Sequence, residues 1–377
     1  MAVRFIHTAD WQIGKPFTQF PKDWQVRLTD ARLDAIDRMA QLARDNRAAF
    51  VLVAGDLFDS DGLGGVTLQA PFARMAEAAP VHWHVLPGNH DPARPGGIWD
   101  RAARAGLPGN VTVHTTPVPV EIGHDVTLLP APLIARRVAN DPTVWMDDAT
   151  STPGNIRLGL AHGAIGRYGS DDHASVPLDP ARAEKASLDY LALGDDHGLK
   201  EINARTWYSG TPEPDGFRDN APGHALLVDI PSRGAPVGVT AHRVARFAWA
   251  ELEAGVDATG EIVGLETALD GLPATRRNCV VRLALKGAVA LDAAANVGRA
   301  LDRLAAQGSF VDADRSGLRR TPSLDDLSDL TEGSELHKVG LRLMRRVDRS
   351  SASPEDQAAA LDALTELLAR HEEHAEP

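Results

Sequence analysis

Five short polar blocks between residues 10 and 198 hold the side chains best suited to chemistry. In chain order they read DWQ, GDLFD, GNHD, AHG and GDDHG. They carry carboxylates, amide carbonyls and imidazoles, the groups that bind divalent cations in proteins. The pattern therefore predicts a metal site. The candidate ligands and their neighbours are Asp10, Gln12, Asp56, Asn89, His90, Asp91, His162, Asp195 and His197.

This set matches what phosphate-ester hydrolysis with two metal ions requires. That reaction needs a carboxylate that bridges the ions, oxygen and nitrogen ligands for each ion, and an acid near the leaving oxygen. The ions lie roughly 3.5–4 Å apart, activate a water between them and screen the charge of the phosphorane. Ligands drawn from several strand ends supply the fixed geometry that this chemistry demands.

Short apolar runs must position the blocks. The runs that directly precede them cover residues 3–9, 48–54, 81–87, 156–161 and 190–194. Residues 32–46 have apolar side chains at the spacing of an amphipathic helix. Strands that alternate with helical patterns favour an α/β domain. Ligand-binding loops gather at strand ends in such sheets, so we expect the five blocks to converge on one site.

The composition sets limits on function and compartment. The 377 residues are 43% hydrophobic and 24% charged, as in ordinary globular proteins. A single cysteine, Cys279, excludes an internal disulfide and a cysteine-based zinc cluster. The N-terminus lacks signal-peptide features and no apolar stretch is long enough to span a bilayer, so we expect a cytoplasmic protein without membrane contact. The net charge of −13 counts against stand-alone DNA affinity, unless bound cations or a partner offset it.

The sequence pattern changes beyond residue 245, where a second structural unit is expected. A strand over 278–289 and a helix over 291–308 predict a small α+β unit, and the polar segment 315–329 reads as a linker. The last helix is expected to have Ser353 as its N-cap and Pro354 as its first residue, with Asp356 closing a capping box. Its leucines form one stripe that either packs on its own domain or docks a partner. The stripe consists of Leu361, Leu364, Leu367 and Leu368.

Two further polar segments have open roles. The run 337–349 sets basic side chains at helical spacing, which could contact DNA or pair with carboxylates. Its basic residues are Lys338, Arg342, Arg345, Arg346 and Arg349. We expect the loop 167–177, which holds Asp171, Asp172 and His173, to be solvated.

Taken together, the five blocks resemble the calcineurin-like metallophosphoesterase superfamily. A protein Ser/Thr phosphatase would carry an Arg in the second block, whereas this block ends in Phe58-Asp59. That ending, the opening FIHTADW and the later run from Trp207 to Ile230 are similar to the DNA-repair exonuclease branch, which includes the SbcD, YhaO and Mre-type nucleases. The resemblance implies an α/β fold: a metallophosphoesterase β-sandwich flanked by helices, a small α+β capping domain and a helical C-terminal segment. The corresponding domains are 1–245, 246–322 and 323–377.

The resemblance also implies a role for each candidate residue. Asp56 would bridge two metal ions. His90 would lie near the leaving oxygen as an acid or a transition-state stabiliser, oriented by Asp91. Asp59 would hold the loop through hydrogen bonds rather than bind metal. The first ion would take Asp10, Gln12 and His197, and the second would take Asn89, His162 and Asp195.

Two positions depart from the branch. Gln12 stands where the branch has His, and Asp195 stands where the last block also has His. Each exchange replaces an imidazole with an oxygen ligand, which favours Mn²⁺, or alternatively Mg²⁺, over zinc. The Gln12 carbonyl is neutral, so we expect the second ion to bind more firmly than the first. Both replacements can still bind metal, which favours adaptation over decay of the site.

The resemblance implies hydrolysis of DNA phosphodiester bonds from a 3′ end, with endonuclease action also open. It implies a partner as well, an SMC-like ATPase of the SbcC, Rad or YhaN kind, and a homodimer is compatible with it. Two other readings stay open. One is a phosphodiesterase for a small nucleotide, and the other is a non-catalytic DNA-end or partner-binding subunit.

Overall fold

The computed structural model describes residues 2–123, 125–165, 176–290, 293–322, 325–347 and 353–375. They form two compact units, Met1–Phe247 and Ala248–Pro377, which are taken separately below. Asp171, Asp172, His173 and Arg349 lie outside the described residues.

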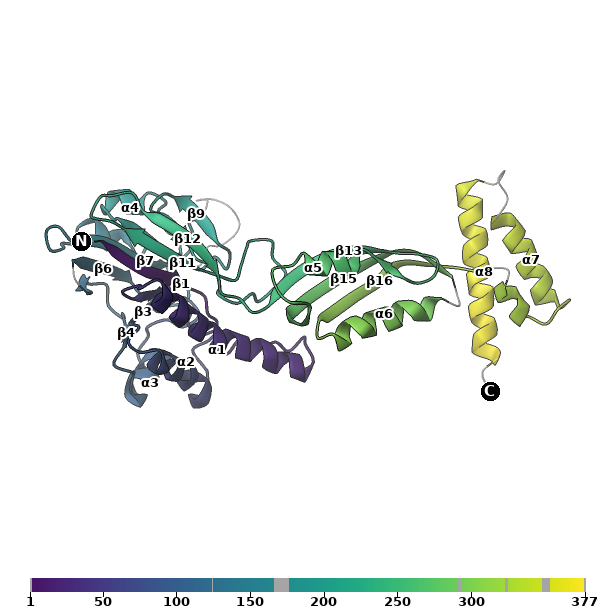
Figure 1. Cartoon of the computed structure of the whole chain (residues 1–377), viewed down its shortest axis with the longest axis horizontal. Helices are drawn as coiled ribbons and strands as arrows, with labels where there is room; N and C mark the ends of the chain where they lie inside the picture. The colour runs from purple at the N-terminus through teal and green to yellow at the C-terminus, as the bar shows by residue number, and fades with distance from the viewer. Residues whose placement is uncertain are drawn as a thin grey trace. The chain divides into compact units, whose positions relative to one another are not determined.

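Two six-stranded sheets make up the first unit (Figure 1). In spatial order the first sheet consists of β12 (Gly238–Arg243), β11 (His224–Ile230), β1 (Val3–Thr8), β2 (Val51–Val53), β3 (Trp83–Val85) and β4 (Val111–Val113). Strands β1 to β4 run parallel, so their carboxyl ends meet at one edge. The second sheet consists of β5 (Val120–Glu121), β6 (Val126–Ala131), β7 (Ile156–His162), β8 (Tyr190–Gly194), β10 (Thr206–Tyr208) and β9 (Lys200–Asn203).

The two sheets face each other across a buried apolar core. Phe5 and Leu52 of the first sheet share this core with Leu128, Leu158 and Tyr190 of the second. Every residue of β6, β7 and β8 is buried, which explains why these strands read as continuous apolar runs rather than alternating ones. The core fixes one sheet against the other, and with it the loops at their ends.

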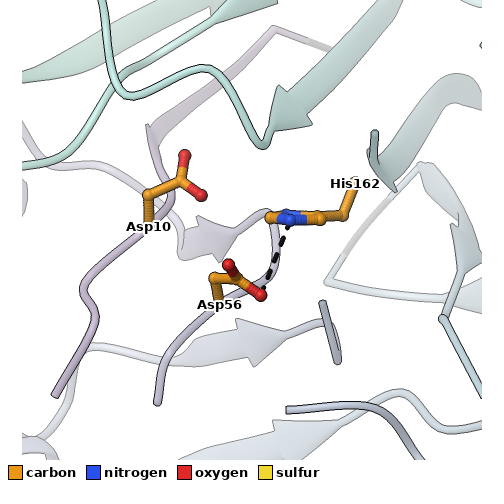
Figure 2. A group of neighbouring side chains, drawn as sticks. All are labelled: Asp10, Asp56 and His162. Carbon is orange, nitrogen blue, oxygen red and sulfur yellow. Dashed lines mark ion pairs between the residues drawn. The ribbon is translucent and has the colours of Figure 1, made fainter. Parts of the chain in front are cut away.

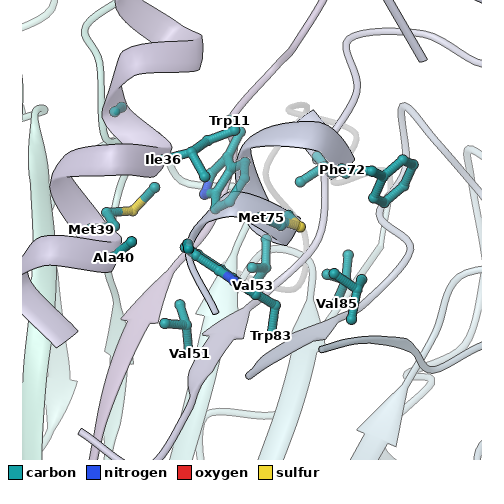
Figure 3. Packing of buried hydrophobic residues seen from close by; sticks show 14 of the residues in the cluster. Trp11, Ile36, Met39, Ala40, Val51, Val53, Phe72, Met75, Trp83 and Val85 are labelled. Carbon is teal, nitrogen blue, oxygen red and sulfur yellow. The ribbon is translucent and has the colours of Figure 1, made fainter. Parts of the chain in front are cut away.

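Helices cover the outer face of each sheet. On the first sheet, α1 (Lys22–Asp45), α2 (Gly65–Glu77) and α3 (Ile98–Ala105) pack on side chains such as Trp83 and Val85 (Figure 3). On the second sheet, η1 (Val144–Asp147) and α4 (Arg182–Lys185) close a separate apolar cluster. The predicted α/β sandwich flanked by helices is confirmed. Helix α1 begins at Lys22, well before the predicted residue 32, because Trp24 and Leu28 are buried as well.

The second unit contains a four-stranded sheet with helices on one face. The strand order is β14 (Ile262–Val263), β13 (Ala248–Val256), β15 (Cys279–Ala290) and β16 (Phe310–Thr321). Helices α5 (Leu265–Asp270) and α6 (Ala294–Ala306) bury the apolar face of this sheet, and η2 (Arg276–Asn278) precedes β15. The predicted linker over 315–329 is wrong in its first part. Residues up to Thr321 pair with β15, and this pairing outweighs their polar, turn-like composition.

The last helices form a hairpin with an apolar core of its own. After η3 (Asp325–Asp329), α7 (Glu335–Val347) and α8 (Pro354–Ala375) pack together around Met344, Leu364 and Leu368. The backbone N–H of Asp356 donates to Ser353 Oγ at 3.1 Å, so the predicted N-cap is confirmed. Leu364, Leu367 and Leu368 of the predicted stripe pack within this hairpin, as the simpler interpretation held for them. Lys338, Arg342, Arg345 and Arg346 of α7 are exposed.

Among the described residues, every helix is too short or too polar to span a lipid bilayer.

Candidate metal centre

Three predicted ligands from both sheets meet in one buried cluster. Asp10 and Asp56 follow β1 and β2 of the first sheet, and His162 is the last residue of β7 in the second (Figure 2). Each offers a ligand atom, and these atoms all lie within 4.8 Å of one another. All three residues are at most 2% exposed. The expected convergence of strand ends is therefore seen for these three residues.

His162 has a nitrogen that is positioned for a cation. Its Nδ1 lies 2.8 Å from the carbonyl oxygen of Ala54. A carbonyl can only accept, so Nδ1 donates its proton and Nε2 keeps its lone pair. Nε2 lies 3.5 Å from Asp56 Oδ1 and 3.7 Å from Asp195 Oδ1, and within the described residues it is buried without a hydrogen bond. The Nε2 lone pair and the nearby carboxylate oxygens of Asp56 and Asp195 form a set of ligands that suits a divalent cation.

Asp10, Asp56 and Asp195 form a group of buried carboxylates whose ionised forms would repel one another. Burial raises the pKa of Asp10 well above its usual range, and the nearby charges of Asp56 and Asp195 raise it further. Burial likewise raises the pKa of Asp195, with Asp56 adding to the shift and His162 opposing it. Buried like charges are unfavourable unless something neutralises them. A bound cation would do so.

The ligand loops adopt a backbone that few side chains tolerate. Asp10, Gln12, Asp56 and Asp195 have φ angles of 55°, 51°, 53° and 100°. Non-glycine residues rarely adopt positive φ, at a cost on the order of 1–3 kcal/mol each. Backbone hydrogen bonds hold two of these loops together, because Asp10 and Gln12 donate to the carbonyls of Gly55 and Asp56 at 3.1 and 3.0 Å. The surrounding structure thus fixes the ligands in a strained arrangement.

Gly88 allows a close approach of two ligand loops. A Cβ at this position would lie 2.2 Å from Asp56 Oδ1 and 2.4 Å from the Asp56 backbone nitrogen. Real Cβ atoms do not come this close, so the loop after β3 can lie against Asp56 only because residue 88 has no side chain. The GNHD block needs its glycine for this reason.

Gln12 and Asp195, the two residues that differ from the pattern of the exonuclease branch, both lie at the candidate metal centre. The Gln12 amide nitrogen donates to Asp56 Oδ2 at 2.8 Å, so this nitrogen, rather than the carbonyl oxygen, faces the carboxylate. The Asp195 backbone N–H lies 3.1 Å from both carboxylate oxygens of Asp10. Asp195 Oδ1 accepts from the Asn89 side-chain nitrogen at 3.3 Å. Asn89 and Asp195 thus stand together on the His162 side of the cluster, where the second ion was expected.

One predicted contact is wrong. His90 was expected to be oriented by Asp91, but the structure places His90 Nδ1 2.8 Å from the backbone carbonyl of Asp59. The buried Asp91 carboxylate instead accepts from the backbone N–H groups of Phe58 and Gly88. These two adjacent side chains therefore have different partners. Asp91 therefore braces the loops around Asp56, and Asp59 holds His90 through its main chain.

His197 is not a member of the Asp10, Asp56 and His162 group, and it lies beside a carboxylate that the sequence did not reveal. Its Nδ1 is 3.0 Å from Oδ2 of Asp215, whose side chain is 5% exposed. Burial alone would raise the pKa of Asp215, but His197, Arg32 and Lys15 outweigh it and hold this pKa well below its usual range. In the sequence Asp215 sits in a Pro-Asp-Gly turn, where an Asp is ordinarily a turn residue.

Comparisons with known proteins agree with this geometry. The family described as calcineurin-like phosphoesterase matches residues 3–199. The chain is 26% identical over 213 residues to a Bacillus subtilis (strain 168) protein called uncharacterized metallophosphoesterase YhaO, which covers 53% of this chain and 50% of that protein. The match therefore spans about half the length of this relative.

Two solved structures are also similar to the chain. The protein TT1561 of Thermus thermophilus is 15% identical, covering 65% of this chain and 100% of that one with a TM-score of 0.41. Purple acid phosphatase PPD1 from yellow lupin seeds is 14% identical, covering 65% of this chain and 52% of that one with a TM-score of 0.43.

Proposed function

The chain belongs to the calcineurin-like phosphoesterase family, and from that premise we propose that it is a two-metal phosphodiesterase that acts on DNA from a 3′ end. The family implies metal-dependent hydrolysis of phosphoesters. The main support for metal binding is the buried cluster of Asp10, Asp56 and His162. In this cluster Nε2 of His162 has no hydrogen bond and lies near the Asp56 carboxylate. Cations bound there would supply an activated water and screen the charge of the phosphate.

Each residue has a task in this proposal. Asp56 lies between Gln12 and His162, and would be shared by both ions. Asp10, Gln12 and His197 would hold the first ion, while Asn89, His162 and Asp195 would hold the second. His90 Nδ1–H donates to the Asp59 carbonyl, so the ring would act as the acid in its doubly protonated form, giving the Nε2 proton to the leaving oxygen.

Mn²⁺ is the proposed metal, with Mg²⁺ as the alternative. Asp195 contributes carboxylate oxygen where the branch has imidazole, and oxygen-rich sites select these cations over zinc. The Gln12 amide must turn to present its oxygen, because its nitrogen now donates to Asp56. That rotation breaks a hydrogen bond, which supports the expectation that the second ion binds more firmly.

The DNA substrate and the partner rest on the resemblance to the exonuclease branch. Residues 246–322 would form the capping domain, and 323–377 would dock an SMC-like ATPase. The exposed arginines of α7 and the partner would supply the positive charge that a chain of net charge −13 needs to hold DNA.

One experiment tests the proposal. The purified protein, with Mn²⁺, Mg²⁺ or Zn²⁺, is given single- and double-stranded DNA labelled at the 3′ or the 5′ end, alongside an Asp56→Ala control. We expect stepwise release of nucleotides from the 3′ end with Mn²⁺ and none from the control. Hydrolysis of bis-p-nitrophenyl phosphate without action on any DNA would identify a small-nucleotide enzyme instead. Absence of bound metal would identify a non-catalytic subunit.

A further inference from the structure

A buried imidazole joins the two sheets of the first unit close to the candidate metal centre. His7 lies in β1, a few residues before Asp10, and it is fully buried. Its Nε2 lies 3.1 Å from the backbone carbonyl oxygen of Leu193, and its Nδ1 lies 3.0 Å from the hydroxyl group of Tyr190. Both partners belong to β8 of the second sheet, which leads directly to Asp195. His7 therefore connects the two strands that precede these predicted ligands.

The two partners also fix which ring nitrogen of His7 carries the proton. A carbonyl oxygen can only accept, so Nε2 donates to Leu193, and Nδ1 accepts from the Tyr190 hydroxyl group. Burial lowers the pKa of His7 to about 3, so the ring is neutral at ordinary pH. Both nitrogens are thus used in hydrogen bonds, one near each end of β8. We call this pair of bonds the His7 link.

The two sheets approach each other closely at the end of β8. A Cβ on Gly194 would lie 2.1 Å from the Ala54 carbonyl oxygen and 2.8 Å from the Ala9 Cβ, so a side chain does not fit there. The next residue, Asp195, has its backbone N–H 3.1 Å from both carboxylate oxygens of Asp10. A shift of β8 along β1 or away from it would break this contact, because hydrogen bonds weaken steeply with poorer geometry.

We propose that His7 is a positioning residue, which fixes the register and spacing of β1 and β8 and thereby holds Asp195 against Asp10. Both ring nitrogens are already bonded, so His7 acts through the backbone of β8 and not as a metal ligand. Its effect on metal binding rests on the proposed two-metal site. Its effect on the Asp195 backbone rests on the His7 link alone.

Another histidine of the same sheet provides a matched control. His84 of β3 stands at the same register as His7, since Leu52 of β2 pairs with both residues. Burial lowers the pKa of His84 to about 3 as well. Its Nδ1, however, lies 3.1 Å from Nε2 of His114, which follows β4 of the same sheet. Replacing His84 therefore removes an imidazole and its hydrogen bond but leaves the His7 link intact.

The test compares His7→Leu, His7→Gln and His84→Leu. Leucine at position 7 removes both bonds of the His7 link, whereas the amide nitrogen of glutamine can still donate to Leu193. In metal-free protein, NMR measures the hydrogen exchange of the Asp195 amide. We expect this exchange to be about tenfold faster in His7→Leu than in His84→Leu, with His7→Gln in between.

Calorimetric titration with Mn²⁺ measures the effect on metal binding. We expect Mn²⁺ to bind about 10–100-fold more weakly to His7→Leu, with partial recovery in His7→Gln and wild-type affinity in His84→Leu. Melting temperatures show how far each variant is destabilised. If His7→Leu does not fold, the comparison of His7→Gln with His84→Leu decides.

Equal Asp195 exchange in the His7 and His84 variants, or an equal weakening of Mn²⁺ binding in both, would overturn the proposal. If the wild type binds no Mn²⁺ but Asp195 still exchanges faster in the His7 variants, the proposed function fails while the positioning of Asp195 by His7 stands.

Discussion

The Nε2 nitrogen of His162 lies 3.5 Å from Oδ1 of Asp56, and no hydrogen bond joins them. The other ring nitrogen is already bonded to the carbonyl of Ala54, so His162 enters the cluster as an acceptor. Two acceptors held this close, in a buried site, repel each other unless a cation lies between them. The metal-free protein should therefore be less stable than the loaded one.

Adding Mn²⁺ should raise the melting temperature of the wild type. A ligand that binds only the folded state stabilises it by about 2.7 kcal/mol at one hundred times its dissociation constant, which for a unit of this size corresponds to roughly 5–10 °C. Calorimetry with Mn²⁺ or EDTA measures the shift. His162→Ala should lose most of it. An equal shift in His162→Ala would place the bound metal elsewhere.

Asp10→Asn should stabilise the metal-free protein at neutral pH. The pKa of Asp10 is raised on folding by burial and by the charges of Asp56 and Asp195, so the folded state holds a proton that the unfolded state releases. The unfolding free energy therefore falls as pH rises from about 4 towards the raised pKa. Chemical denaturation across this range should show the advantage of Asp10→Asn growing with pH. A constant difference would contradict this origin.

Gly88→Ala should disrupt the site without touching a ligand directly. The added methyl group would lie 2.2 Å from Asp56 Oδ1, so either the GNHD loop or Asp56 must move, at about 1–3 kcal/mol. We expect Mn²⁺ affinity to fall along with the melting temperature. Gly109→Ala is the control, because its methyl group would have no neighbour within 4 Å. Unchanged Mn²⁺ affinity in Gly88→Ala would show that the loop yields instead of Asp56.

His90→Asn should separate catalysis from metal binding. If His90 supplies the proton for the leaving oxygen, its loss should lower kcat by about 10²–10⁴-fold. Among the described residues its side chain hydrogen-bonds only to the Asp59 carbonyl, so both Mn²⁺ affinities should stay at wild-type values. Hydrolysis of bis-p-nitrophenyl phosphate and calorimetric titration measure the two quantities. A parallel loss of metal affinity would make His90 a ligand.

Gln12→His distinguishes an adapted ligand from a lesion. An imidazole in place of the amide should shift the preference of the site from Mn²⁺ towards zinc, since nitrogen ligands suit zinc better. Competition between the two metals, followed by calorimetry, gives the preference directly. If the metal preference stays the same while hydrolysis increases, Gln12 represents the loss of a metal ligand rather than an adaptation of the site.

The sequence was sufficient for the fold class and for the three clustered ligands, for a simple reason. Buried parallel strands read as apolar runs, and the polar residue at the end of each run is placed by the strand itself. Asp10, Asp56 and His162 could be predicted because no long-range contact has to be known to locate them.

The remaining features depend on contacts between distant residues. His90 contacts the backbone carbonyl of Asp59 rather than Asp91, and the Gln12 amide nitrogen is oriented by its hydrogen bond to Asp56. Asp215 lies beside Lys15 and His197, which are far away in the chain. Short-range patterns carry no information on such pairings.

Because the ligands come from both sheets of the first unit, a bound cation would also stabilise the fold. It would be a removable cross-link between chain segments that are distant in sequence, tying the loop after β2 to the end of β7. Cross-links that close long loops restrict the unfolded chain most. Chelation should therefore loosen the sandwich at the end where β2 and β7 meet the site, while the apolar core around Phe5 and Leu158 keeps the rest of the two sheets together.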